Sequence, residues 1–127
     1  MGLDTSHDCW HGSYSSFAIW RTEISRALGW PTWGEGRYSF PEDSPRTEDV
    51  LYGWWGFGKT PEEPLHVLLL HSDCDGYIFP WNADPLADRL LDLLEEKRIP
   101  DEWQEITKQF AVGLQRAAYE CEVVEFR

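Results

Sequence analysis

The sequence is short of positive charge. Its 127 residues include 11 Lys and Arg against 23 Asp and Glu, for a formal net charge of -12. A protein that binds duplex nucleic acid needs a basic face to displace counterions, so we expect no such partner. The same balance disfavours an anionic membrane surface. A small anionic ligand is still compatible with it, because two or three local cations or a helix N-terminus are enough to bind one.

Long hydrophobic runs are also missing. No apolar segment approaches the roughly 20 residues that a membrane-spanning helix needs, and no secretory signal is present. The three cysteines are an odd number, which in a chain without such a signal favours reduced thiols. We therefore expect a cytoplasmic protein without a membrane partner.

The hydrophobic periodicity predicts three helices in a single domain that spans residues 1–127. One covers about 14–28 and ends at Gly29. The next has Asp84 as N-cap and Pro85 at its first position. The last starts with the capping pair Asp101 and Gln104. The three apolar stripes consist of Phe17, Trp20, Ile24 and Leu28; of Leu86, Leu90, Leu93 and Leu94; and of Trp103, Ile106, Phe110, Leu114, Ala117 and Cys121.

Strand signals are shorter than the helical ones. The run "PLHVLLL" is apolar on both faces, which is typical of a central strand, and "YIF" after Gly76 is expected to pair with it. The segment "CEVVEFR" predicts an edge strand and "GLDTS" a short first strand. We predict an α+β fold of three helices packed on a small sheet. The aromatic Gly- and Pro-rich segment 29–64 is expected to be a long loop or lid.

Potentially reactive residues gather in two clusters. Three of the four histidines and two of the three cysteines lie in them. We call His7, Asp8, Cys9 and His11 the N-terminal cluster, and His71, Asp73, Cys74 and Asp75 the central cluster. If "GLDTS" and "HVLLL" are parallel neighbouring strands, both clusters follow strand ends at the same edge of the sheet, where open sheets place ligand sites.

This convergence would suit a divalent metal. Zinc binds about four Cys, His or carboxylate ligands, and a catalytic site keeps one position for water. The predicted metal ligands are His7, Asp8, Cys9, His11, His71, Asp73 and Cys74, and the predicted catalytic residues are His11, His71, Asp73 and Asp75. Two alternatives stay open. One is a cysteine nucleophile, Cys9 or Cys74, with a histidine base, and the other is a purely structural role for each residue.

The start of the first helix is a second candidate site. Gly12, Ser13, Ser15 and Ser16 surround free backbone N–H groups there, and such a helix start binds phosphate or carboxylate. The alternative is simple N-capping by a serine. Arg21 and Arg37 could add charge to the same anion. The aromatic residues that could stack on a base are Trp10, Tyr14, Trp54, Trp55 and Trp81.

The runs "MGLDTSHDCWHGSYSSF" and "LLLHSDCDGYI" resemble a family of small proteins from bacteriophages and bacterial genomes. Members open with an MGLD-S-HDCW-G-YS-F run and carry an HSDCDG element near mid-chain. The resemblance covers these two segments and, weakly, "LADRL". By analogy with other small phage proteins, it implies a protein that counters host defence in the host cytoplasm.

These observations together predict an anti-defence protein that binds a small nucleotide-derived signal, such as a cyclic dinucleotide or an ADP-ribose derivative. It would disable the signal by metal-assisted phosphodiester hydrolysis, with a metal-bound water as nucleophile. The alternatives are a non-enzymatic sponge for the same ligand class, in which an oligomer completes the pockets, and a zinc-stabilised protein-interaction module.

Overall fold

A computed structural model describes residues 2–34, 37–38, 63–71 and 76–127. This part of the chain is α+β and mostly helical, with four α-helices and two small antiparallel sheets. The elements are β1 (Gly2–Asp4), the 3-10 turn η1 (Ser6–Asp8), β2 (His11–Ser13), α1 (Tyr14–Ala27), α3 (Leu65–Leu69), β3 (Tyr77–Ile78), α4 (Pro80–Glu95), the 3-10 turn η2 (Asp101–Trp103), α5 (Gln104–Tyr119) and β4 (Val124–Glu125). The predicted α+β class is confirmed, whereas the described residues form four α-helices and two sheets where the sequence predicted three helices on one small sheet.

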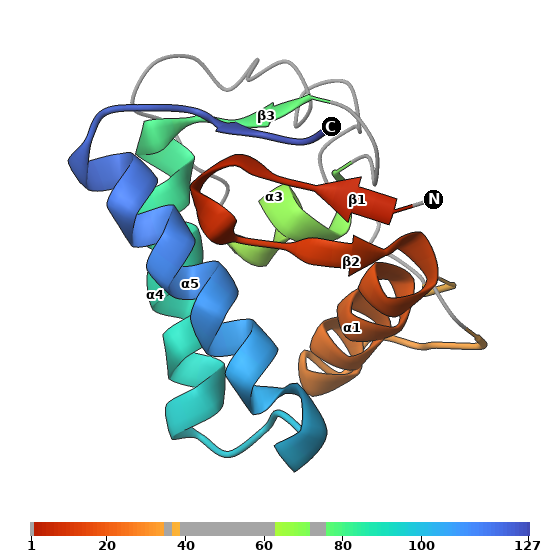
Figure 1. Cartoon of the computed structure of the whole chain (residues 1–127). Coiled ribbons are helices and arrows are strands. Elements are labelled where there is room, and N and C mark those ends of the chain that lie inside the picture. The colour runs from red at the N-terminus through yellow and green to blue at the C-terminus, as the bar shows by residue number, and fades with distance from the viewer. Residues whose placement is uncertain (1, 35–36, 39–62, 72–75) are drawn as a thin grey trace.

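The core is built where α1 meets the α4–α5 pair. In Figure 1, α4 and α5 run antiparallel side by side. α1 follows directly after β2, at the end of the β1–β2 hairpin that lies away from α5. Trp20 of α1 is fully buried, with its ring 4.9 Å from Phe110 of α5. Its indole N–H donates to the Thr107 hydroxyl at 2.9 Å, which satisfies the polar end of a large apolar side chain. The helical stripes predicted from the sequence therefore do face one common core.

The last residues of the chain join the two sheets. β1 pairs antiparallel with β2, so that Leu3 lies opposite Gly12, and β3 pairs antiparallel with β4. Thr5 forms a bridge with Phe126, and Asp4 and Arg127 exchange two backbone hydrogen bonds of 3.0 and 2.9 Å. The C-terminal segment thus has backbone partners on both sides, the N-terminal strand region and the β3 region (Figure 1).

The three longest helices end in the same backbone motif. A residue in the left-handed region comes after each helix: Gly29 (φ 81°) after α1, Lys97 (φ 57°) after α4 and Cys121 (φ 56°) after α5. After α5, the N–H groups of Cys121 and Glu122 donate to the carbonyls of Ala118 and Ala117 at 3.2 and 2.9 Å, which defines a Schellman motif. The predicted stop at Gly29 is confirmed.

Several boundaries and pairings predicted from the sequence are wrong. Cys121 is exposed and lies beyond α5, so it does not belong to the apolar stripe of that helix. The predicted central strand is the helix α3, which is buried along most of its length. Consequently "GLDTS" has no parallel neighbour there, and Tyr77–Ile78 pairs with β4 instead.

The start of α4 also differs from the prediction. The helix begins at Pro80 with Phe79 as N-cap, so Pro80 and not Pro85 takes the first helical position and Asp84 is not the cap. Pro85 lies inside the helix. Both prolines satisfy the same sequence rule, and only the packed structure selects between them.

Most of the segment predicted as a long aromatic loop or lid, 29–64, lies outside the described residues. Within its described part, Thr32 pairs with Tyr38, and the Tyr38 hydroxyl donates to the Leu69 carbonyl at 2.8 Å. Among the helices of the described ranges, none combines the length and the apolar character that a membrane crossing requires.

Candidate functional site

The N-terminal cluster forms a tight turn against α5. His7 and Asp8 both have left-handed backbone angles, with φ of 60° and 57°. The turn can approach the helix because position 113 is glycine. A Cβ atom at Gly113 would lie 2.5 Å from the Cys9 sulfur and 2.8 Å from the His7 carbonyl oxygen, closer than real Cβ atoms come to such neighbours. The glycine at position 113 therefore allows η1 to pack directly against the backbone of α5.

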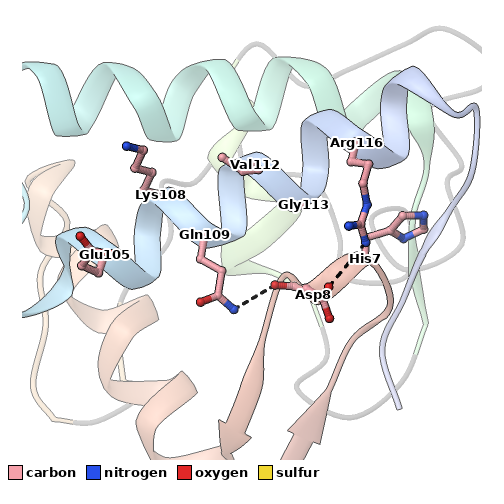
Figure 2. A pocket seen from close by; sticks show the side chains of 8 residues that line it. All are labelled: His7, Asp8, Glu105, Lys108, Gln109, Val112, Gly113 and Arg116. Atoms are coloured by element: carbon pink, nitrogen blue, oxygen red, sulfur yellow. Dashed lines mark hydrogen bonds and ion pairs between the residues drawn. The ribbon is translucent and has the colours of Figure 1, made fainter.

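A groove of about 410 Å³ lies between η1 and α5. We call it the α5 groove. Figure 2 shows its lining: His7 and Asp8 come from the turn, and the other residues come from one face of the helix. The lining residues are His7, Asp8, Glu105, Lys108, Gln109, Val112, Gly113 and Arg116. A smaller cavity of about 60 Å³ shares Gln109 with it and is otherwise lined by Cys9, Trp10, His11 and Ile106.

The α5 groove contains two cations, of which Lys108 has no partner among the described residues and Arg116 has two long ion pairs. Lys108 makes no hydrogen bond or ion pair with any of them. The Arg116 guanidinium lies 3.8 Å from an Asp8 carboxylate oxygen and 3.7 Å from one of Glu120, both longer than a direct hydrogen bond. Gln109 donates to the Asp8 carbonyl at 2.9 Å and holds the turn in place (Figure 2). In the described part of the chain, Lys108 is therefore available to a ligand, and Arg116 would have to exchange its long contacts with Asp8 and Glu120 for a direct one.

His7 faces the chain segment that comes after α5. Its Nδ1 lies 2.8 Å from the Ser6 hydroxyl oxygen and its Nε2 lies 2.9 Å from a Glu122 carboxylate oxygen. The hydrogen bond from His7, and secondarily the one with Glu120, holds the pKa of the Glu122 carboxyl below its ordinary value. His7, Glu120 and Glu122 each offer one ligand atom within 4.8 Å of the other two. Among the predicted metal ligands in the described part of the chain, His7 is thus the one that has two further candidate ligands, Glu120 and Glu122, beside it.

His11 forms an exposed network with two aspartates. Its Nδ1 contacts the Asp4 carboxylate and its Nε2 lies 3.0 Å from Asp8 Oδ1. These hydrogen bonds, with Asp8 the larger cause and Asp4 the next, raise the pKa of the His11 imidazole. The same bond from His11 lowers the pKa of the Asp8 carboxyl. The network ties the η1 turn to the β1–β2 hairpin.

Cys9 does not fit either chemical role predicted for it. Its side chain is buried, and desolvation raises the pKa of the thiol to about 12. A nucleophile or a zinc ligand has to be a thiolate. The residue is instead part of the packing between the turn and Gly113, as the structural alternative for a lone buried cysteine expects.

His71 is buried away from both cavities of the N-terminal region. It is 3% exposed, and its Nε2–H donates to the Tyr77 carbonyl at 2.9 Å. Its ring lies 4.1 Å from that of Phe126, whose backbone pairs with Thr5. The two clusters are therefore linked through Phe126, and neither described cavity includes His71 in its lining. Asp73, Cys74 and Asp75 lie outside the described residues.

The start of α1 supports the capping alternative. Ser13 is the N-cap, and its hydroxyl oxygen accepts from the Ser16 backbone N–H at 3.1 Å. The hydroxyls of Ser15 and Ser16 lie 3.2 and 2.9 Å from the Ser13 oxygen, so these groups contact one another. Gly12 pairs with Leu3 in the hairpin. Phosphate binding at this helix start stays a prediction.

Arg21, one of the two arginines predicted to assist that helix start, is engaged at the end of α3. Arg21 donates to the carbonyls of Leu68 and His71 at the end of α3, and its guanidinium carbon lies 4.6 Å from the Phe17 ring centroid. These contacts fix α3 against α1. Arg37 is exposed, and its backbone N–H donates to the Gly34 carbonyl.

The predicted stacking role of Trp10 is wrong. Trp10 is 4% exposed, its ring stacks on Trp20 at 5.4 Å, and the cavity of about 60 Å³ that it helps to line is well below the size of a small-ligand site. Tyr14 is half-buried against the core. Trp81 is half-buried and stacks on Phe79 at 4.9 Å with an interplanar angle of 6°. Trp54 and Trp55 lie outside the described residues.

Sequence reasoning missed the half of the site that α5 contributes. The missed residues are Glu105, Lys108, Gln109, Val112, Arg116, Glu120 and Glu122. Helical spacing does place most of them on one polar face, and two lysine or arginine residues on that face are unusual in so acidic a chain. Their proximity to His7 is invisible in the sequence, because about 100 residues or more separate them.

No protein-family model, curated protein or solved structure matches this chain. The local geometry of the α5 groove is therefore the basis for a functional proposal.

Proposed function

We propose that the protein binds a small phosphate-bearing ligand of the nucleotide-derived class in the α5 groove. The observation that supports the proposal is the pair of cations, Lys108 and Arg116, on one face of α5 in a chain of net charge -12. Lys108 has no partner among the described residues, and the ion pairs of Arg116 are both longer than 3.5 Å. The groove volume of about 410 Å³ falls in the range of small-ligand sites. An anion placed there would gain charge-assisted hydrogen bonds from Lys108 and Arg116, although the lining also includes the carboxylates of Asp8 and Glu105.

The exposed apolar groups beside the cations would contact the rest of the ligand. Val112 lines the groove and is 51% exposed, and Tyr119, three residues beyond Arg116, is 90% exposed. Residues three apart lie on the same side of a helix. In the proposed complex the Tyr119 ring takes the stacking role that the sequence suggested for Trp10, because base–aromatic stacking needs an open ring face.

Of the two versions of this function, sequestration is favoured over hydrolysis. His71 is buried with its Nε2–H engaged, and both ring nitrogens of His11 already contact aspartates. A general acid or base must reach the substrate directly or through one water. The proposed biological role is the one that the resemblance suggests, a phage-type protein that removes a nucleotide immune signal.

The test measures binding of a panel of cyclic dinucleotides and ADP-ribose by calorimetry, with inorganic phosphate for comparison. We expect at least one nucleotide to bind, and Lys108→Gln and Arg116→Gln each to weaken its binding about tenfold, which is the loss of one charge-assisted contact. Lys97→Asn is the matched control, because it removes an exposed cation outside the groove lining at a left-handed position that Asn tolerates.

After binding, the complex is heat-denatured and the ligand analysed by chromatography. Intact ligand supports sequestration, and cleaved ligand supports the hydrolase. Failure of the whole panel to bind, or equal binding by the groove variants and the wild type, would rule out the α5 groove as the nucleotide site.

A further inference from the structure

We infer that His7, Glu120 and Glu122 form a binding site for a divalent transition metal, with manganese and zinc as the matching ions. The three side chains come from opposite ends of the chain and meet beside the C-terminal end of α5. Their ligand atoms lie within 4.8 Å of one another. The inference stands apart from the proposed function, because it concerns the metal alone.

The donor set has the composition of a three-ligand metal site. One imidazole and two carboxylates suit zinc, manganese or ferrous iron better than calcium, which takes oxygen ligands only. Ligand atoms around a tetrahedral zinc are roughly 3.3 Å apart, given Zn–N and Zn–O bonds of about 2.0–2.1 Å. His7 Nε2 and the Glu122 oxygen are already 2.9 Å apart. Glu120 then has to approach by a rotamer change, which its 43% exposed side chain allows.

The imidazole is positioned for coordination through Nε2. The His7 side chain is only 11% exposed, and Ser6 contacts its Nδ1 at 2.8 Å. The Ser6 hydroxyl oxygen also accepts from the Glu125 backbone N–H at 2.9 Å. When Nδ1–H donates to Ser6, the Nε2 lone pair faces the Glu122 carboxylate. This is the arrangement in which a second hydrogen-bond partner orients a metal-bound histidine. In the proposed site the cation takes the place of the Nε2 proton that otherwise bonds Glu122.

The two carboxylates reach the same place because of the Schellman turn after α5. The left-handed Cys121 separates Glu120 from Glu122 and brings the second carboxylate back beside the helix end. The C-terminal end of a helix carries partial negative charge, so two glutamates there repel each other and attract a cation. Arg116 supplies only weak compensation, with its Nε 3.7 Å from a Glu120 oxygen.

The experiment titrates the purified full-length chain with Mn²⁺ alone and then with Zn²⁺ alone, by calorimetry. Mn²⁺ is the deciding probe, because it avoids thiolates and a cysteine elsewhere cannot bind it in place of the site. We expect one Mn²⁺ per chain, with affinity at least about tenfold lower in Glu120→Gln, Glu122→Gln and His7→Asn. Asn is chosen at position 7 because it tolerates the left-handed backbone.

Two further variants keep the result interpretable. Arg116→Gln removes the cation that competes for Glu120, and we expect it to tighten Mn²⁺ binding roughly threefold or more. Unfolding cannot produce an effect of that sign. Glu95→Gln, a carboxylate near the end of α4, should leave binding unchanged. Absence of a saturable one-to-one Mn²⁺ isotherm, or ligand variants that bind like the wild type, would overturn the metal site. Nucleotide binding without Mn²⁺ binding would remove this inference and leave the proposed function standing.

Discussion

His11 and His71 stand in similar stretches of sequence but in opposite environments. Each lies within three residues of a cysteine and an aspartate that the sequence groups with it. His11 is on an exposed hairpin, with its ring held between Asp4 and Asp8. His71 is buried under Phe126 at the end of α3, where it bonds a backbone carbonyl. Histidine thus belongs to an accessible surface in one region and to the core in the other.

The difference arises from the segments that pack around each histidine. The N-terminal cluster continues into β2 and the exposed start of α1, while α5 covers only one side of the turn. His71 instead has α1 on one side, through Arg21, and the C-terminal segment on the other, through Phe126. A cluster of polar residues is therefore a candidate site only where the packing leaves one side open to a ligand.

The largest expected effect comes from truncating the two histidines. His71→Ala should lower the free energy of unfolding by about 3 kcal/mol, because it leaves a cavity under Phe126 and removes the partner of the Tyr77 carbonyl. His11→Ala should cost less than about 1 kcal/mol, since the side chain is 47% exposed. Urea denaturation of both variants measures the difference. Equal losses would mean that the two histidines do not differ in burial.

A somewhat smaller effect is expected at the contact that supports the accessible region. Gly113→Ala should cost about 2 kcal/mol, because the added Cβ would meet the Cys9 sulfur and the His7 carbonyl, and the gain in helix propensity offsets only part of that. Val112→Ala, one residue earlier and exposed, is the control and should cost less than about 0.5 kcal/mol. Chemical denaturation checks both. A stable Gly113→Ala protein would show that η1 can move off α5 freely.

The smallest effect concerns the pH dependence of the His11 network. The raised pKa of His11 makes its contribution to stability complete below the unfolded value near 6.5, and the contribution is lost as the pH rises through the folded pKa. The lowered pKa of Asp8 makes its contribution present above the ordinary value of 3.8 and lost as the pH falls through the folded pKa. The network should therefore be strongest between about pH 4 and 6.5.

An NMR titration of the His11 ring measures this shift directly. In Asp8→Asn the pKa of His11 should fall toward its ordinary value, because the largest cause of the shift is removed. Asp92→Asn, on α4, is the control and should leave the His11 titration unchanged. A His11 pKa that does not respond to Asp8→Asn would show that the two side chains are not paired in solution.

In the helices α1 and α5, the local hydrophobic pattern correctly predicted the large apolar side chains that are buried. Phe17, Trp20 and Ile24 repeat at helical spacing and are all buried, as are Phe110 and Leu114. The same method failed on "PLHVLLL", because an apolar run that short fits a buried helix and a buried strand equally well. It also placed Cys121 inside the last helix, because the left-handed residue after α5 is this cysteine and not the glycine that usually marks a helix end.

In the candidate site, too, the sequence predicted some of the residues and missed others. The N-terminal cluster was found from its composition, and two of its members, His7 and Asp8, do line the α5 groove. The carboxylates nearest to His7 could not be found this way, because Glu120 and Glu122 lie at the opposite end of the chain. Trp10 was predicted to be a stacking surface, but its ring is buried and contacts Trp20 and Phe17.

The sequence by itself determined the helical faces, the acidic surface and the grouping of reactive residues at the N-terminus, because each depends on composition or on neighbours a few positions apart. Only the tertiary structure decided that His11 is open to solvent and His71 is buried, and which side chains of α5 lie beside the N-terminal cluster. Those outcomes depend on the close approach that Gly113 permits and on the C-terminal segment that pairs with Asp4 and Thr5. Contacts between distant segments form only when the whole core packs, and a local sequence pattern does not record them.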